Sequence, residues 1–137
     1  MLLTAKQEKG LRIAVERYKS NEKYTVISGY AGSGKSTVIK YIIAALNVDP
    51  DRVVYVAYTG KAANVLRQKG CANAITAHKL LYKAYQNKNG EFRFTPKEEL
   101  DEPYQVVVVD EVSMLPLTMW NRLLTHNVYV LACGDPG

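Results

Sequence analysis

The chain has 137 residues, of which 47% are hydrophobic and 23% are charged, and it contains only nine glycines and five prolines. This composition excludes disordered and fibrous proteins, and the length fits a single globular domain. Eighteen basic and thirteen acidic residues leave a net charge of +5, which suits a polyanionic partner without requiring one. No apolar run resembles a signal peptide or a bilayer span, so we expect a cytoplasmic protein with no membrane partner.

Hydrophobic spacing predicts an alternation of helices and strands. Apolar residues recur at three- and four-residue intervals in the helical segments, whereas the strands are short apolar runs without polar alternation. Such runs are typical of strands covered on both faces of a parallel sheet, so we expect an α/β fold with right-handed crossovers. In chain order the expected elements are a helix over 4–19, a strand over 24–28, a helix over 35–46, a strand over 53–58, helices over 60–69 and 76–85, a strand over 105–109, a helix that begins at Pro116, and a strand over 128–132.

One segment departs from this alternation. Residues 87–90 read Asn-Lys-Asn-Gly, a turn sequence, and Phe92 and Phe94 alternate with polar residues directly after it. An Asn-Gly turn followed by an alternating run favours a β-hairpin. We therefore expect a small hairpin insertion over 86–103.

Residues 29–36 match the phosphate-binding pattern G-x-x-x-x-G-K-[ST] between an expected strand and an expected helix. Glycines let successive backbone N–H groups point at phosphate oxygens, and the start of the helix adds its positive end. Lys35 is expected to hold the β- and γ-phosphates, and Ser36 to offer a hydroxyl ligand to Mg²⁺. The motif predicts a P-loop NTPase that uses ATP and Mg²⁺, with a plain glycine-rich turn as the alternative. The residues expected to bind the nucleotide in this segment are Gly29, Ala31, Gly32, Ser33, Gly34, Lys35, Ser36 and Thr37.

A second acidic motif follows the apolar run at 105–109. Asp110 and Glu111 come directly after four consecutive valines, at the edge of the sheet where the P-loop is also expected to emerge. Phosphoryl transfer depends on positioning and on neutralising charge, so we expect Asp110 to orient the Mg²⁺ hydration shell and Glu111 to polarise the attacking water. The alternative is an ordinary solvated acidic turn.

Four segments, taken in order and at their spacing, resemble a known family. They are Ala-Tyr-Thr-Gly-Lys-Ala-Ala at 57–63, Thr-Ala-His-Lys-Leu-Leu at 76–81, Asp-Glu-Val-Ser-Met-Leu at 110–115 and Gly-Asp-Pro at 134–136. Together with the P-loop they are similar to the motifs of superfamily 1 DNA helicases, nearest to the RecD-like and Dda-like group, over residues 3–136. The resemblance implies that residues 1–137 form the first of two RecA-like domains. In the family these domains clamp ATP between them and move along single-stranded DNA, commonly 5′ to 3′.

The resemblance also implies roles for residues outside the two nucleotide motifs. Gln7 falls where the family contacts adenine, although Thr4-x-x-Gln7 is equally a helix capping box. Thr59, Lys61, Thr76 and His78 match family positions that touch DNA phosphates. Their ordinary explanations are helix N-caps, a solvated lysine and a satisfied histidine.

The chain shows one departure from the family pattern and one insertion. Tyr58 replaces the proline usual in the family and could stack on a base. The hairpin occupies the place of the family's pin, where Phe92 and Phe94 either pack against the domain or act as a wedge against a base pair.

The second RecA-like domain, its arginines and the family's γ-phosphate-sensing glutamine have no counterpart in these 137 residues. We therefore expect the isolated chain to bind nucleotide weakly and to unwind nothing. Two other functions stay open: a P-loop kinase of the thymidine-kinase type, and a nucleotide-gated DNA-binding module without turnover.

Overall fold

The computed structural model describes residues 3–27 and 33–134, without the side chains of residues 33–36. The elements in chain order are α1 (Ala5–Lys19), β1 (Tyr24–Ile27), α2 (Ser33–Leu46), η1 (Pro50–Arg52), β2 (Val53–Ala57), α3 (Gly60–Gln68), β3 (Ile75–Thr76), α4 (Ala77–Leu81), β4 (Tyr82–Gln86), β5 (Phe92–Pro96), β6 (Val106–Val109), η2 (Val112–Met114), α5 (Leu117–Leu123) and β7 (Tyr129–Cys133).

Five strands form one parallel sheet in the order β1-β7-β6-β2-β3. Every residue of the two central strands, β6 and β7, is buried, as expected of apolar runs covered on both faces. Strand β7 lies between β1 and β6, with Ala132 opposite both Val26 and Val109. The predicted α/β fold with a parallel sheet is confirmed.

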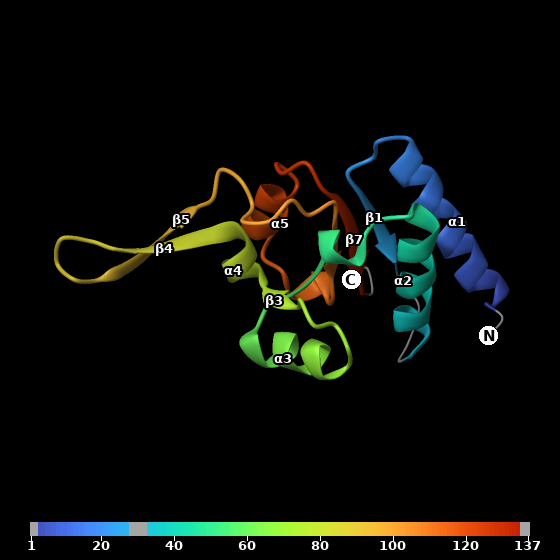
Figure 1. Cartoon of the computed structure of the whole chain (residues 1–137), viewed down its shortest axis with the longest axis horizontal. Helices are drawn as coiled ribbons and strands as arrows, with labels where there is room; N and C mark the ends of the chain where they lie inside the picture. Colours follow the sequence, from blue (N-terminus) through green and yellow to red (C-terminus); the bar gives the residue numbers. More distant parts are fainter. Residues whose placement is uncertain (1–2, 28–32, 135–137) are drawn as a thin grey trace.

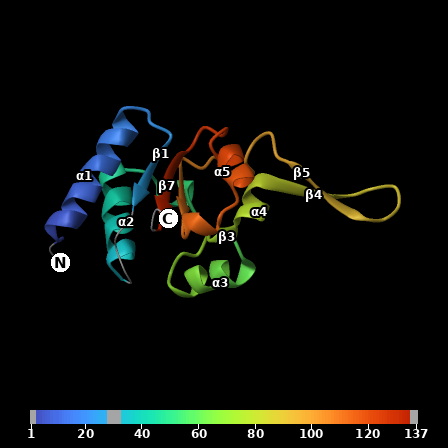
Figure 2. The same ribbon diagram turned by 180° about the vertical axis from the view of Figure 1, so that it is seen from behind.

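Helices cover both faces of the sheet, with α1 and α2 on one side and α4 and α5 on the other (Figures 1 and 2). The alternation of side chains along β6 explains the two cores. Val106 and Val108 belong to the core beneath α1 and α2, whereas Val107 and Val109 belong to the core beneath α4 and α5. Helix α3 packs beside β2 and β3 at the far edge. Among the described residues, no helix has the length and apolar character needed to cross a membrane.

The predicted helix over 76–85 is wrong in its second half, because α4 ends at Leu81 and the chain passes directly into β4. Strand β4 pairs antiparallel with β5, so the hairpin spans residues 82–96 rather than 86–103. The Asn87 side chain accepts hydrogen bonds from the backbone N–H groups of Asn89 and Glu91, both at 2.9 Å. This turn fixes the register of the five residue pairs between β4 and β5. In residues 82–85 the pairing with β5 outweighs the helical spacing of the sequence.

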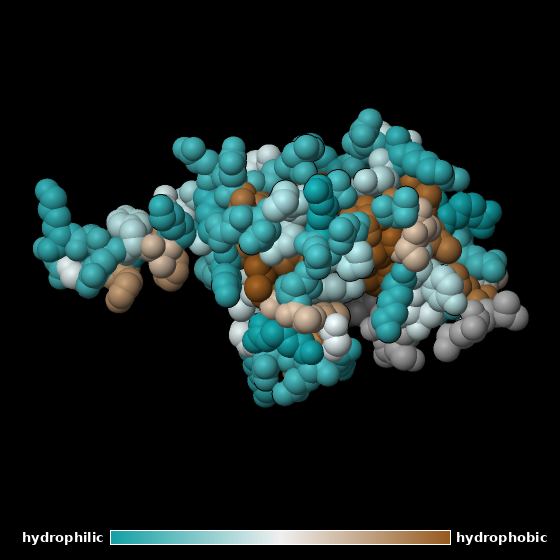
Figure 3. Space-filling view, in the orientation of Figure 1, coloured by the Kyte–Doolittle hydropathy of each residue, from teal (hydrophilic) through white to brown (hydrophobic). Residues whose placement is uncertain are grey.

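The hairpin projects away from the body of the molecule (Figure 1). Its apolar side chains stand in solvent on an otherwise hydrophilic projection (Figure 3). Phe92 and Phe94 are 70% and 62% exposed, so the main body of the domain does not bury them.

Candidate nucleotide and nucleic-acid site

The carboxyl ends of the parallel strands bring the candidate residues to one edge of the sheet. The N–H of Gly134, which follows β7, donates to the carbonyl oxygen of Ile27 at the end of β1 at 3.1 Å. The N–H of Asp110, which follows β6, donates to the carbonyl oxygen of Val56 in β2 at 2.9 Å. Ligand sites of parallel α/β sheets lie at this edge.

In the sequence, residues 29–36 begin after β1 and end within the first turn of α2. Helix α2 begins at Ser33, two residues earlier than the sequence predicted, so the backbone of Ser33, Gly34, Lys35 and Ser36 forms its first turn. The first turn contains no acidic residue, which leaves the positive end of the helix uncompensated by its own sequence. Gly29, Ala31 and Gly32 lie outside the described residues, as do the side chains of 33–36. Thr37, the last predicted nucleotide contact, is half-buried in α2.

Asp110 and Glu111 follow the buried strand β6 as predicted, with Asp110 half-buried and Glu111 exposed. The Glu111 Oε1 atom accepts a hydrogen bond from Ser113 Oγ at 2.9 Å. Gly134 lies so close that a Cβ atom there would be 2.5 Å from the same oxygen. The end of β1, the acidic pair after β6 and the residue after β7 therefore lie together.

A small cavity of about 100 Å³ adjoins Asp110 on the α2 side of the sheet, and Cys71, Cys133 and Tyr55 help to line it. Burial raises the pKa of the Cys71 thiol, and the negative charge of Asp110 raises it further, while Lys40 and Lys69 act in the opposite direction. Neither cysteine forms a disulfide among the described residues. Cys71 is therefore expected to be protonated at neutral pH.

Gln7 completes a capping box at the start of α1. Its backbone N–H donates to Thr4 Oγ1 at 3.1 Å, and its Oε1 accepts from the backbone N–H of Thr4 at 2.9 Å. The structural explanation of Thr4-x-x-Gln7 is thus confirmed. Contact with adenine stays a prediction.

Thr59 and Thr76 are the N-caps of α3 and α4. Their hydroxyls accept from the backbone N–H groups of Ala62 and Lys79 at 3.1 and 3.2 Å. Strands β2 and β3 pair with Ala57 opposite Thr76, so the two caps begin from adjacent strand ends. The N-cap explanation is confirmed for both residues, and each hydroxyl still has a proton to donate to a phosphate oxygen.

His78 is the centre of an aromatic cluster. Its ring centroid lies 6.1 Å from that of Tyr58, 5.7 Å from Tyr82 and 6.3 Å from Phe94. We call these four residues the His78 cluster. It joins the loop after β2, helix α4 and the base of the hairpin, and it replaces the expectation of a lone histidine.

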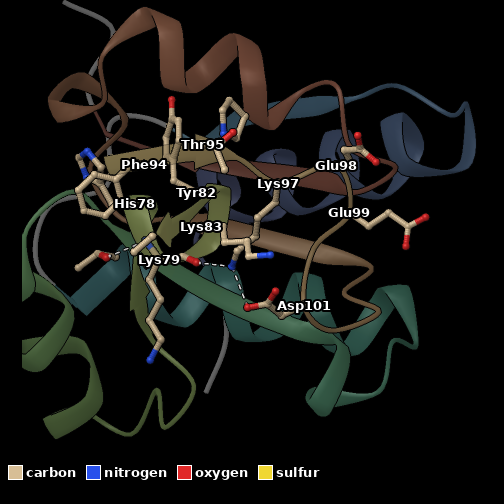
Figure 4. A pocket seen from close by; sticks show the side chains of 13 residues that line it. His78, Lys79, Tyr82, Lys83, Phe94, Thr95, Lys97, Glu98, Glu99 and Asp101 are labelled. Atoms are coloured by element: carbon tan, nitrogen blue, oxygen red, sulfur yellow. Dashed lines mark hydrogen bonds and ion pairs between the residues drawn. The ribbon is translucent and has the colours of Figure 1, made fainter. Parts of the chain in front are cut away.

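A pocket of about 980 Å³ lies beside this cluster. Figure 4 shows His78, Tyr82 and Phe94 at one end of it and Glu98, Glu99 and Asp101 at the other. Lys97 is engaged in structure, because its Nζ donates to Asp101 Oδ2 and to the carbonyl oxygen of Lys79, both at 2.7 Å. The acidic end therefore repels a polyanion, whereas the aromatic end carries no negative charge.

The hairpin presents two chemically different faces. Ala84 lies opposite Phe94 and Gln86 opposite Phe92, so the two phenylalanine rings share one face, as their alternation predicted. Tyr85 lies opposite Arg93 on the other face. Both phenylalanines are largely exposed, although the Phe94 ring also contacts His78. Their role toward a ligand stays a prediction.

The sequence profile of a family described as an AAA domain matches residues 12–137. The chain belongs to this AAA domain family. Three relatives are similar to this AAA domain in sequence. The ATP-dependent DNA helicase dda of Enterobacteria phage T4 is 30% identical over 125 residues, covering 90% of this chain and 28% of the relative. The RecBCD enzyme subunit RecD of Mycolicibacterium smegmatis is 32% identical, covering 90% and 26%. The multifunctional conjugation protein TraI of Escherichia coli K12 is 31% identical, covering 82% and 6%.

These matches confirm the resemblance to the RecD-like and Dda-like helicases. The AAA domain spans about a quarter of the length of the first two relatives and far less of the third. Activities of those whole proteins therefore bear on this chain only as proposals.

Sequence reasoning missed two residues of the site in this AAA domain. Tyr82 is expected in a helix from the sequence, because its strand conformation depends on pairing with Pro96 across the hairpin. Ser113 was noticed only as part of a motif, and no sequence pattern indicates that its hydroxyl reaches Glu111. Lys61 is exposed in the first turn of α3 as predicted, whereas Phe92 lies farther out on the hairpin than the His78 cluster.

Proposed function

We propose that this AAA domain is the ATP-binding motor domain of an ATP-dependent DNA helicase, and that it moves along single-stranded DNA in the 5′ to 3′ direction common in the group it resembles. The main support is the adjacency of β6 and β2. Asp110 at the end of β6 is hydrogen-bonded to β2 three residues before Thr59, at 2.9 Å between Asp110 N and Val56 O. Asp110, which is proposed to act on the nucleotide, and Thr59, which is proposed to contact DNA, thus follow neighbouring strands of the sheet.

On the nucleotide side, the start of α2 and Lys35 bind the phosphates of ATP. No group of three or more His, Cys, Asp or Glu side chains within the described residues is arranged to hold a metal on its own. Mg²⁺ commonly binds through one or two protein oxygens together with substrate phosphates and water. The hydroxyl of Ser36 and the carboxylate of Asp110 are suitable oxygen ligands, and the ion supplies charge neutralisation to the phosphates. Glu111 polarises the attacking water.

On the DNA side, Thr59, Lys61 and Thr76 contact phosphates of the single strand. The His78 cluster offers aromatic faces on which bases stack without sequence preference. His78 is exposed and surrounded by rings, so we assign it to stacking as well as to phosphate contact. Phe92 and Phe94 meet the end of the duplex as a wedge.

A second RecA-like domain of the same protein completes the ATP site in this proposal. In related systems an arginine supplied from a second surface accelerates hydrolysis by about 10³ to 10⁵. The 137-residue chain alone is therefore expected to bind Mg-nucleotide and to hydrolyse it slowly.

The test is ATP hydrolysis by the protein that carries this domain, measured as phosphate release with and without single-stranded DNA. We expect stimulation by DNA in the wild type and loss of turnover in Asp110→Asn. Transfer of phosphate to a nucleoside without DNA stimulation would instead identify a kinase. DNA binding with no phosphate release in any condition would identify a nucleotide-gated binding module.

A further inference from the structure

One polar side chain outside the assigned residues contacts the proposed base directly. Ser113 Oγ donates to Glu111 Oε1 at 2.9 Å. We propose that Ser113 is a positioning residue that fixes the Glu111 carboxylate for activation of water, a role that rests on the function proposed above for Glu111.

The local backbone brings the hydroxyl to the carboxylate. Glu111 is extended, with φ −134° and ψ 91°, and η2 begins at the next residue. The N–H of Met114 donates to the Glu111 carbonyl oxygen at 3.0 Å, which closes the turn around Ser113. Leu115, which follows η2, is buried and anchors it to the core beneath α5.

Gly134 bounds the same carboxylate from another strand end. Its φ of +133° favours glycine, and an added Cβ would lie 2.5 Å from Glu111 Oε1 and 3.3 Å from Glu111 Cδ. The Gly134 N–H is bonded to the Ile27 carbonyl oxygen at 3.1 Å. The oxygen that accepts from Ser113 is thus also limited in its movement by a segment tied to β1.

Helix capping does not explain the contact. Glu111 occupies the N-cap position of η2, yet its side chain makes no capping hydrogen bond there. The carboxylate is directed instead to the Ser113 hydroxyl, which is exposed and has water as an alternative partner.

Orientation is the property that such a contact supplies. An exposed glutamate samples several rotamers, and a base must face the proton that it removes. A neutral hydroxyl restricts the carboxylate without pairing it to a positive charge. The second carboxylate oxygen receives no hydrogen bond from Ser113 and remains available to a water molecule.

The test compares Ser113→Ala with Ser113→Thr in the protein that carries the domain, using DNA-stimulated ATP hydrolysis. Ser113→Ala removes the donor and is expected to lower kcat by about 10-fold with little change in KM for ATP. Ser113→Thr keeps the hydroxyl and is expected to stay within about twofold of the wild-type kcat. Gly134→Ala, which forces Glu111 to move, should also lower kcat while Mg-ADP affinity is retained.

Glu111→Gln is the reference variant. If it leaves kcat unchanged, the proposed function of Glu111 is wrong. If it abolishes turnover while Ser113→Ala retains the wild-type kcat, the positioning role is overturned. A Ser113→Thr variant as slow as Ser113→Ala, or a Ser113→Ala defect confined to KM, also contradicts it.

Discussion

Tyr129 joins α1 to the sheet through its hydroxyl. The phenol donates to the Ala14 carbonyl oxygen at 2.7 Å and is also hydrogen-bonded to the Thr25 hydroxyl. Because the phenol has a single hydrogen, Thr25 is the donor in that second contact. Tyr129 is only 4% exposed, and its burial raises the pKa of the phenol, an effect that the Thr25 hydrogen bond partly offsets.

Tyr129→Phe is predicted to lower the free energy of unfolding by about 1–3 kcal/mol, because two buried groups lose a hydrogen-bond partner. Chemical denaturation measures the change. The matched control is Tyr85→Phe on the exposed hairpin, where the same substitution should cost less than about 0.5 kcal/mol. Equal effects at the two positions would show that the hydroxyl of Tyr129 does not contribute to stability.

His126 gives the fold a predictable pH dependence. Burial lowers the pKa of its imidazole below the ordinary 6.5, and Arg122 lowers it further. Its Nε2 is buried without a hydrogen-bond partner among the described residues. The unfolded chain therefore binds the proton more readily than the folded one, and protonation favours unfolding.

We predict that stability falls as the pH drops from about 7 to 5, and that His126→Gln flattens this part of the curve. Thermal unfolding across this range measures both slopes. His78→Gln is the comparison for loss of an exposed histidine. Equal slopes for wild type and His126→Gln would exclude His126 as the source.

At the scale of elements, hydrophobic pattern predicted the helices and the four longer strands of the sheet to within a few residues. The valine run before Asp110 could be predicted because a strand buried on both faces needs apolar residues at every position. The prediction of a helix over 76–85 is wrong from Tyr82 onward. Residues 82–86 form a strand because they pair with Phe92–Pro96, a segment that lies further along the chain. Local spacing does not contain that information.

The hairpin is predicted to take part in DNA unwinding through its two phenylalanines. Phe92→Ala and Phe94→Ala should reduce DNA unwinding while leaving DNA-stimulated ATP hydrolysis intact, because the rings lie on one exposed face of the hairpin and outside the strand end that carries Asp110 and Glu111. Phe92→Ala should also leave stability within about 0.5 kcal/mol of the wild type, since the side chain is 70% exposed. Unwinding is measured with a forked duplex.

Tyr85→Ala is the matched control on the opposite face of the same hairpin. It removes an aromatic ring of intermediate exposure, 46%, without touching the phenylalanine face. If Phe92→Ala and Phe94→Ala unwind DNA at the wild-type rate, the two phenylalanines do not act as a wedge. A defect of equal size in Tyr85→Ala would show that unwinding does not depend specifically on the face that carries Phe92 and Phe94.

For the whole molecule, the sequence predicted which strand ends carry functional residues but not how they adjoin. Parallel topology explains why Asp110 and the P-loop helix share an edge. The insertion of β7 between β1 and β6, and hence the contact of Gly134 with Glu111, depends on strand order. The His78 cluster likewise could not be predicted from the sequence, because Tyr82 and Phe94 reach His78 only through the pairing of β4 with β5.

Two lysines lie at opposite ends of the parallel strands. Lys61 lies at the carboxyl edge of the sheet in the first turn of α3, whereas Lys19 lines a pocket at the amino edge. If single-stranded DNA follows the carboxyl edge, Lys61→Ala should weaken binding and reduce the slope of log affinity against log salt by about 0.7. Lys19→Ala should change neither, and equal slopes for both variants would contradict this path.

Residues 29–36 are proposed to bind the phosphates of ATP together with Mg²⁺. The most direct measurement is the affinity of the chain for Mg-ADP, by calorimetry or fluorescence, in wild type and Lys35→Ala. We predict saturable binding by the wild type, and weakening by 10-fold or more in Lys35→Ala, since about 1.4 kcal/mol of lost phosphate interaction suffices for that factor. Unchanged unfolding of the variant would show that the loss is local. Equal affinity of the two proteins for Mg-ADP would contradict the account.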